Sequence, residues 1–190
     1  MLSERKKALL TAMRDREEGV RTAAAAAMDL VEGRERLQEI FNTYKEGDNA
    51  AKLKAIFALG RLKDERGSAL LIRASRSSCE EVRVAAISMI GTLGIKSGLF
   101  ALIERLDDSS GFVKIKAVEA LGLVGCKEAV PYLLAQLDSD NIELKIKTIE
   151  SLGALGSADA ESAIIKLVND ESITVRAKSV KALGDLSIQD

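Results

Sequence analysis

Lysine, glutamate and phenylalanine side chains recur in this 190-residue sequence at a spacing that could build a binding surface. Lysines stand at positions 54, 116, 147 and 178, which differ by multiples of 31, and the other members of the group lie three or four residues from one of them. Exposed aromatic residues rimmed by charges are typical of sites that bind a protein segment, and the lysines predict an acidic one. The candidate binding groove comprises Lys54, Phe57, Phe112, Lys116, Glu119, Lys147, Glu150, Lys178 and Lys181.

The same residues have a second interpretation, as a solvated helix face. Lys116 and Glu119, and likewise Lys147 and Glu150, are three residues apart, a spacing at which opposite charges on one helix form pairs. Long lysine stems can also cover apolar neighbours without binding a partner. The sequence leaves both interpretations open.

Several kinds of catalytic chemistry lack the residues that they need. The chain has no histidine, which removes imidazole metal sites and Ser-His or Cys-His catalysis. Its glycines do not form the phosphate-binding patterns GxGxxG or GxxxxGK[ST]. The two cysteines, Cys79 and Cys126, do not have the spacing of a zinc site or a disulfide framework and are expected to be free thiols. We therefore expect no metal, no cofactor and no enzymatic activity of the chain alone.

The overall charge also limits the choice of partner. A formal net charge of -1 and a sequence pI near 5.8 argue against a protein that coats nucleic acid or membranes, although one basic face remains possible. No apolar run approaches the roughly 18 residues that span a bilayer, and the first residues do not resemble a signal peptide. A cytoplasmic location is expected.

A repeated motif that ends in glycine positions these side chains. The stretch 113–122 (VKIKAVEALG) has counterparts whose last glycine lies at positions 60, 91, 122, 153 and 184, and Asp29 holds that place in a first copy. We call these residues the markers. A constant period of 31 residues indicates stacked units that share one core. The units are predicted at 3–32, 33–63, 64–94, 95–125, 126–156 and 157–190, and together they form one domain.

Each unit is predicted to contain a first helix, A, and a second helix, B. Aromatic residues make up only 3% of the chain and there is one proline, which favours closely packed helices. Gly33 is expected to end the first unit, and the Gly47-Asp48-Asn49 turn to start the second B helix. The A helices are predicted at 3–14, 34–45, 66–76, 97–107, 128–138 and 159–169. The B helices are predicted at 18–31, 49–60, 80–93, 111–124, 141–155 and 172–186.

One position of every B helix is always small. It lies five residues before the marker, and we expect two helix backbones to approach each other there. Its occupants are Ala24, Ala55, Ala86, Ala117, Thr148 and Ser179.

A base stands eight residues before every marker, and an acid or a hydroxyl stands six residues earlier. The bases are Arg21, Lys52, Arg83, Lys114, Lys145 and Arg176, and the earlier residues are Asp15, Glu46, Ser77, Asp108, Ser139 and Asp170. With Leu106-Asp107-Asp108, Val113-Lys114, Ala117 and Ala120-Leu121-Gly122 in one unit, the sequence resembles the HEAT-like repeat family, in its short form like that of bilin lyase subunits. The resemblance covers essentially the whole chain. It implies an all-α, right-handed α-α superhelix, an armadillo-like solenoid of about six helix pairs or twelve helices whose B helices line the concave face.

The resemblance also implies a ladder of side-chain contacts between neighbouring repeats. By position, Asp15, Asp108 and Asp170 would accept hydrogen bonds from Arg21, Lys114 and Arg176 and from the next repeat, and would help to cap the B helices. The serines at 77 and 139 are expected to break or reroute the ladder.

Three functions are consistent with the sequence. The leading prediction is a non-catalytic scaffold or adaptor that binds an acidic segment of another protein in the B-helix groove. The first alternative is a nucleic-acid-binding solenoid similar to those of DNA alkylation repair. The second, implied by the short repeat, is a subunit of a bilin lyase-like complex.

Overall fold

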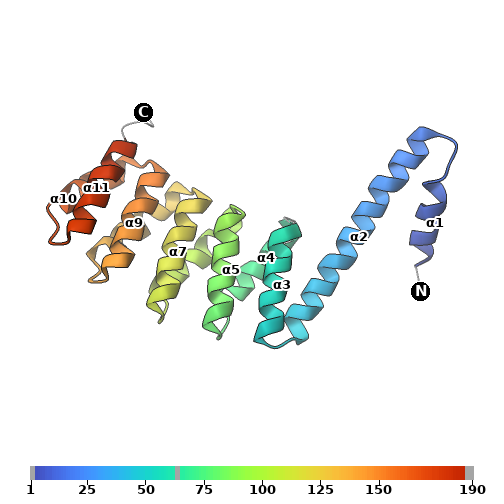
Figure 1. Cartoon of the computed structure of the whole chain (residues 1–190), viewed down its shortest axis with the longest axis horizontal. Coiled ribbons are helices and arrows are strands. Elements are labelled where there is room, and N and C mark those ends of the chain that lie inside the picture. Colours follow the sequence, from blue (N-terminus) through green and yellow to red (C-terminus); the bar gives the residue numbers. More distant parts are fainter. Residues whose placement is uncertain (1–2, 63–64, 187–190) are drawn as a thin grey trace.

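The computed structural model describes residues 3–62 and 65–186, and within these ranges the chain is helical without any β-strand. Five long helices stand side by side in a row (Figure 1). They are α3 (Asn49–Leu62), α5 (Glu80–Thr92), α7 (Gly111–Val124), α9 (Ile142–Leu155) and α11 (Ile173–Leu186). They agree closely with the predicted B helices, and Asp48 accepts a hydrogen bond from the N–H of Ala51 (2.9 Å) as the predicted cap of α3.

The A helices are shorter than predicted and lie behind this row (Figure 1). They are α4 (Ser68–Ala74), α6 (Leu99–Glu104), α8 (Val130–Leu134) and α10 (Ala158–Leu167). Tighter 3-10 turns extend three of them. One precedes α4 (Glu65–Gly67), two flank α6 (Lys96–Gly98 and Arg105–Asp107) and two flank α8 (Lys127–Ala129 and Ala135–Asp138). Gly94, Gly125 and Gly156 have φ between 59° and 73°, so they supply the left-handed residue that lets each B helix end and the next A helix begin.

The N-terminal part departs from the prediction. After α1 (Glu4–Ala12), a single helix, α2 (Glu18–Glu46), covers the two helices predicted at 18–31 and 34–45. Gly33 does not end a helix, and the described residues contain eleven α-helices, not twelve. The turn glycines of later repeats lie three residues after the marker, but the first unit has Glu32 there, and Gly33 does not have positive φ. A glycine inside a helix costs only about 1 kcal/mol relative to alanine, which is too little to break it.

The residue at the marker position gives a second reason why α2 continues as one helix. A Cβ on Gly91 would lie 2.8 Å from the Cα of Ala120, and one on Gly122 would lie 2.8 Å from the Oγ of Ser151. Consecutive B helices therefore approach most closely where the marker meets the residue two before the next marker. Asp29 occupies the marker of the first unit and is exposed, since its side chain would not fit such a contact.

One apolar core runs through the row from Leu37 to Ala182. The always-small position is buried in every repeat, as predicted, although the closest helix approach is at the marker. Ala24 and Met28 of the first unit are buried but lie outside this core, and Val20 is 41% exposed. None of the helices in the described ranges is long and apolar enough to cross a membrane.

Candidate partner-binding surface

The residues of the candidate groove lie at three repeat positions on the exposed B-helix side, which are ten, six and three residues before the marker. Lys54 and Phe57 belong to α3, and Phe112, Lys116 and Glu119 to α7; Lys147 and Glu150 belong to α9, and Lys178 and Lys181 to α11. Spacings of three and four residues put the members from one helix on one face of it. We call this set the B-helix face.

Five of its charged groups form a continuous chain across three helices. Lys116 Nζ lies 2.8 Å from Glu119 Oε2, and the other oxygen of Glu119 lies 3.2 Å from Lys147 Nζ. Lys147 is also 3.2 Å from Glu150 Oε2, and Glu150 accepts a hydrogen bond from Lys178. We call this row the charge chain. The pairs within one helix were predicted from the sequence, whereas the links from Glu119 to α9 and from Glu150 to α11 were not.

The chain holds its members in their charged forms. Burial would raise the pKa of Glu119, but hydrogen bonds from Lys116 and Lys147 outweigh it and lower the pKa below its ordinary value. The hydrogen bond from Lys178 is the main reason why the pKa of Glu150 is lowered. Hydrogen bonds to Glu119 and Glu150 raise the pKa of Lys147. At neutral pH the two glutamates therefore compensate two of the three lysine charges of the charge chain, which keeps a net positive charge.

Apolar side chains flank the charge chain. Phe112 is 51% exposed, and Lys116 Nζ lies 5.5 Å from the centre of its ring. Leu123, at the other end of the same helix face, is 64% exposed and borders a hollow of about 310 Å³ with Glu150 and Ala154. The structure does not bring Lys54 and Phe57 into this group, because α5, with Ala85 and Ser88 at the matching positions, lies between α3 and α7.

The ladder is present, but it differs from the prediction in direction and in its partners. Arg83 Nη2 donates to Asp108 Oδ1 (2.9 Å) and Lys145 Nζ to Asp170 Oδ2 (3.0 Å), so each aspartate is bound by the preceding repeat, not the next. Lys114, the base of the repeat that contains Asp108, makes no side-chain hydrogen bond or ion pair with the described residues.

The arginines of the ladder close the turn between their own A and B helices. Arg21 donates to the carbonyl oxygens of Asp15 (3.0 Å) and Arg16 (2.8 Å), and Arg176 donates to those of Asp170 (2.8 Å) and Glu171 (3.0 Å). The predicted bonds from these arginines to the aspartate carboxylates are therefore wrong. Arg21 also cannot reach the acid of the next repeat, because 25 residues of one helix, about 37 Å, separate it from Glu46.

The ladder aspartates close the turns that precede the B helices and, contrary to the prediction, do not cap the helices themselves. The cap of α7 is Ser110, which accepts a hydrogen bond from the N–H of Val113. Asp15, Asp108 and Asp170 each accept a hydrogen bond from the N–H two residues on, at 2.8 to 3.0 Å. Ser77 and Ser139 make the same local bond, at 3.3 and 3.2 Å, without any ion pair between repeats, so the predicted break in the ladder is confirmed.

Burial would raise the pKa of Asp108, but bonds from Ser110 and Arg83 and the charges of Arg83 and Arg105 lower it below its ordinary value. Its carboxylate therefore stays ionised opposite Arg83.

One contact between repeats was missed altogether. Arg76 binds Glu104 through two hydrogen bonds, Nε to Oε2 at 2.8 Å and Nη2 to Oε1 at 2.9 Å. Arg76 lies fifteen residues before its marker and Glu104 lies eighteen before the next, and no other boundary has a base and an acid in this order, so an alignment of the repeats gives no signal for the pair.

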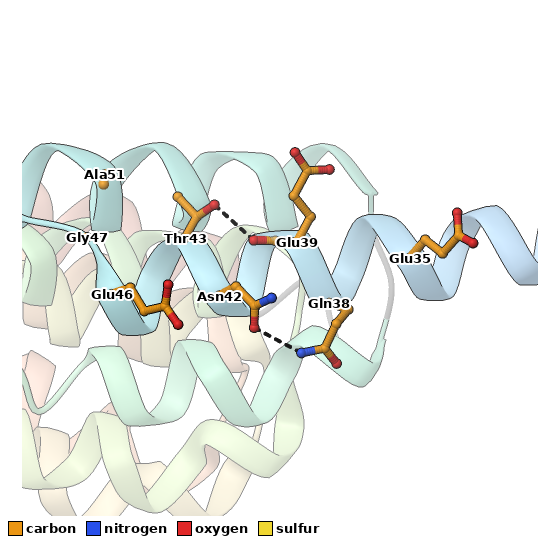
Figure 2. A pocket seen from close by; sticks show the side chains of 8 residues that line it. All are labelled: Glu35, Gln38, Glu39, Asn42, Thr43, Glu46, Gly47 and Ala51. Atoms are coloured by element: carbon orange, nitrogen blue, oxygen red, sulfur yellow. Dashed lines mark hydrogen bonds between the residues drawn. The ribbon is translucent and has the colours of Figure 1, made fainter. Parts of the chain in front are cut away.

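A second hollow follows the outer side of α2 (Figure 2) and contains the acids Glu35, Glu39 and Glu46. The three carboxylates are spread along the helix, and Glu35 is paired with Lys6 of α1. No group of side chains in the described ranges is arranged to hold a metal ion.

Comparisons with known proteins agree on the architecture. A sequence model of HEAT repeats matches residues 35–122, 67–143, 99–160 and 130–190. Comparison with curated protein sequences gives no match.

Among solved structures, a chain of the CpcE and CpcF complex of phycocyanin lyase from Nostoc sp. PCC7120 superposes with a TM-score of 0.70 and 22% identity over 81% of this chain. The match spans 65% of that chain, which is less than two thirds of it. A designed armadillo repeat protein in complex with the peptide (KR)4 has a TM-score of 0.60 and 16% identity, covering 97% of this chain and 100% of that one. An archaeal HEAT-like repeats protein from Thermococcus onnurineus NA1 has a TM-score of 0.52 and 14% identity, covering 96% and 87%. At these identities the similarity establishes the fold.

Proposed function

This chain belongs to the HEAT-repeat family, and from that premise we propose that it is a non-catalytic scaffold that binds a segment of another protein on its B-helix face. The binding region would extend from α7 to α11, where the charge chain and the exposed apolar groups lie together. The fold itself suits such a role, because stacked helix pairs expose a long continuous surface.

The observation that carries the proposal is the pairing of exposed apolar side chains with a preorganised row of charges. Phe112 and Leu123 are both more than half exposed at the two ends of one helix face. Lys116 and Glu119 lie between them and are already held in place by their ion pair. A partner would therefore bury apolar surface without having to order the charged side chains around it.

The charge chain also favours an acidic partner. Lys147 contacts two glutamates, but Lys116 and Lys178, at its ends, contact one each. The side chains of Lys116 and Lys178 are 29% and 37% exposed, so each ammonium group can bind a second carboxylate. Lys181 is exposed on α11, next to the end of the charge chain, and adds a further positive charge.

The test is affinity capture from source cells with matched surface variants. Phe112→Ser combined with Leu123→Ser removes the apolar groups of the surface. Phe100→Ser is the control, since Phe100 is 71% exposed on the A helix α6. We expect loss of a partner with the double variant, retention with the control, and unchanged thermal unfolding of both. Equal recovery with all three proteins would refute the assignment of the surface.

A second candidate is a subunit of a two-chain lyase-like complex. Its support is the similarity to the phycocyanin lyase complex, in which two chains assemble. The test is co-expression with a second solenoid protein from a neighbouring gene, in the presence of a bilin pigment. A purified two-chain complex that absorbs visible light through bound pigment would support this candidate. Absence of both the complex and the absorption would remove this candidate.

The nucleic-acid alternative is disfavoured by the ion pairs. Three of the five lysines of the B-helix face contact glutamates, which would oppose a phosphate backbone at the same place. Salt-dependent retention of the purified protein on heparin would contradict this conclusion.

A further inference from the structure

At two sets of positions, acid–base pairs join some of the neighbouring repeats on their A-helix side. A residue fifteen before one marker meets a residue eighteen before the next, and a residue eight before meets one fourteen before the next. Where the third repeat meets the fourth, both pairs are formed: Arg76 binds Glu104, and Arg83 binds Asp108. Each of these two bases of the third repeat therefore meets a carboxylate of the fourth, and Arg105 of the fourth repeat contacts both acids.

The boundary between the second and third repeats lacks both acids. Its equivalent residues are Lys45 with Arg73, and Lys52 with Ser77. A base replaces the first carboxylate and a hydroxyl replaces the second. All four residues line one hollow of about 760 Å³, formed by the C-terminal end of α2, the start of α3 and α4. These helices lie next to one another in Figure 1.

The hollow is strongly basic. Its lining contains Lys45, Lys52, Arg73 and Arg76 and no acidic residue, although the chain as a whole has a net charge of -1. Glu104 of the fourth repeat neutralises Arg76. Within the described residues the other three form no ion pair or side-chain hydrogen bond. Three positive charges therefore converge on this hollow, and no acid of the described part of the chain is paired with them.

The rest of the lining is apolar. Phe41, Leu70 and Ile72 contribute to it, and Ala69 stands where the next repeat has the much larger Phe100. The Tyr44 ring also lines the hollow; burial raises the pKa of its phenol, and the charge of Arg73 opposes that rise. The smaller alanine leaves space beside the bases, and that space can accept an apolar side chain.

We propose that this hollow, which we call the basic hollow, binds an acidic segment of a partner protein. Two carboxylates of the segment take the places that Glu104 and Asp108 hold one repeat further on. Because those two acids are four residues apart, the matching ligand carries acids about one helical turn apart with an apolar residue between them. The site lies on the A-helix side and does not depend on the proposed role of the B-helix face.

The binding test uses the full chain and labelled peptides with blocked ends. One peptide carries two glutamates four residues apart with leucines between them, and the reference peptide has glutamine at both positions. Fluorescence anisotropy at low ionic strength should detect tighter binding of the glutamate peptide, by about tenfold or more. Equal affinity for the two peptides overturns the proposal. Equally effective competition by citrate or inorganic phosphate would show a small-anion site and would overturn the choice of a protein segment.

A variant that supplies the missing acids separates binding from folding. Arg73→Glu with Ser77→Asp recreates both pairs of the next boundary, so we expect unchanged or increased thermal stability together with loss of peptide binding. The control, Lys96→Glu with Ser139→Asp, makes the same change in net charge, and its serine occupies the same ladder position two repeats away. It should bind like the original chain. Unchanged binding by the first variant overturns the proposal, and should that variant fail to fold, Lys45→Gln and Lys52→Gln provide the same test.

Discussion

Replacing Asp108 with serine should remove a buried ion pair while preserving the turn that contains it. Arg83 and Asp108 have side chains that are 9% and 4% exposed, and their charged atoms are 2.9 Å apart. Serine already occupies the same ladder position at Ser77 and Ser139, where its Oγ accepts the local hydrogen bond from the N–H two residues on. The substitution Asp108→Ser therefore keeps the turn and removes the contact with Arg83, together with a weaker ion pair to Arg105 of the same repeat (3.4 Å).

The expected loss follows from the partners that Arg83 retains. Removing one member of a buried ion pair typically costs about 3–5 kcal/mol, because the other charge is left without compensation. Arg83 would still donate to the carbonyl oxygens of Ser77 (2.9 Å) and Ser78 (3.1 Å). These bonds reduce the penalty, and we expect the free energy of unfolding to fall by about 2–3 kcal/mol.

Urea unfolding followed by circular dichroism measures this loss. A double-mutant cycle with Arg83→Met gives the coupling energy between the two side chains. Asp170→Ser is the matched control, because its partner Lys145 is more exposed, at 19%, and we expect a loss of only about 1 kcal/mol. A coupling energy below about 0.5 kcal/mol, or a larger loss for Asp170→Ser than for Asp108→Ser, would refute the reasoning.

Three further substitutions or conditions have defined outcomes. Gly33→Ala should raise the free energy of unfolding by about 0.5–1 kcal/mol in urea titrations, because Gly33 lies inside a continuous helix. A lower free energy of unfolding would instead support a helix end at Gly33. Ala117→Leu should lower it by about 1–3 kcal/mol, since Ala117 is fully buried, and unchanged thermal unfolding would contradict that packing. The pKa values of Glu119 and Glu150 are lowered in the folded state, so their stabilisation is present above the unfolded values near pH 4.3 and is lost as the pH falls through the lower folded values. Urea titrations between about pH 6 and pH 3 should show this loss, and it should be smaller in Glu119→Gln with Glu150→Gln.

The regular part of the fold could be predicted because its signals are local. The marker glycines and the glycines three residues after them fix the ends of α5, α7 and α9 to within one or two residues. The pair of Lys116 with Glu119 likewise depends only on the geometry of one helix.

The contacts between repeats could not be derived in the same way. The ladder aspartate at position 108 lies six residues before Lys114 in the sequence, yet it binds Arg83 of the preceding repeat. That choice depends on how one unit is stacked on the next, which the spacing of charges within a unit does not determine. The continuity of α2 could not be predicted for a related reason: Gly33 does not have the left-handed backbone that Gly94, Gly125 and Gly156 adopt after α5, α7 and α9, and the residue type alone does not reveal this.

The charge chain has a mechanical consequence. Gly122 touches α9 at Ser151, and Gly153 touches α11 at Ala182, so each pair of neighbouring helices has a tight point of contact that can serve as a pivot. Glu119 and Glu150 bridge the same two gaps beside those pivots. Dissolved salt weakens such bridges far more than it weakens the apolar contacts. The angle at which successive helices cross, and with it the curvature of the whole array, should therefore respond to ionic strength.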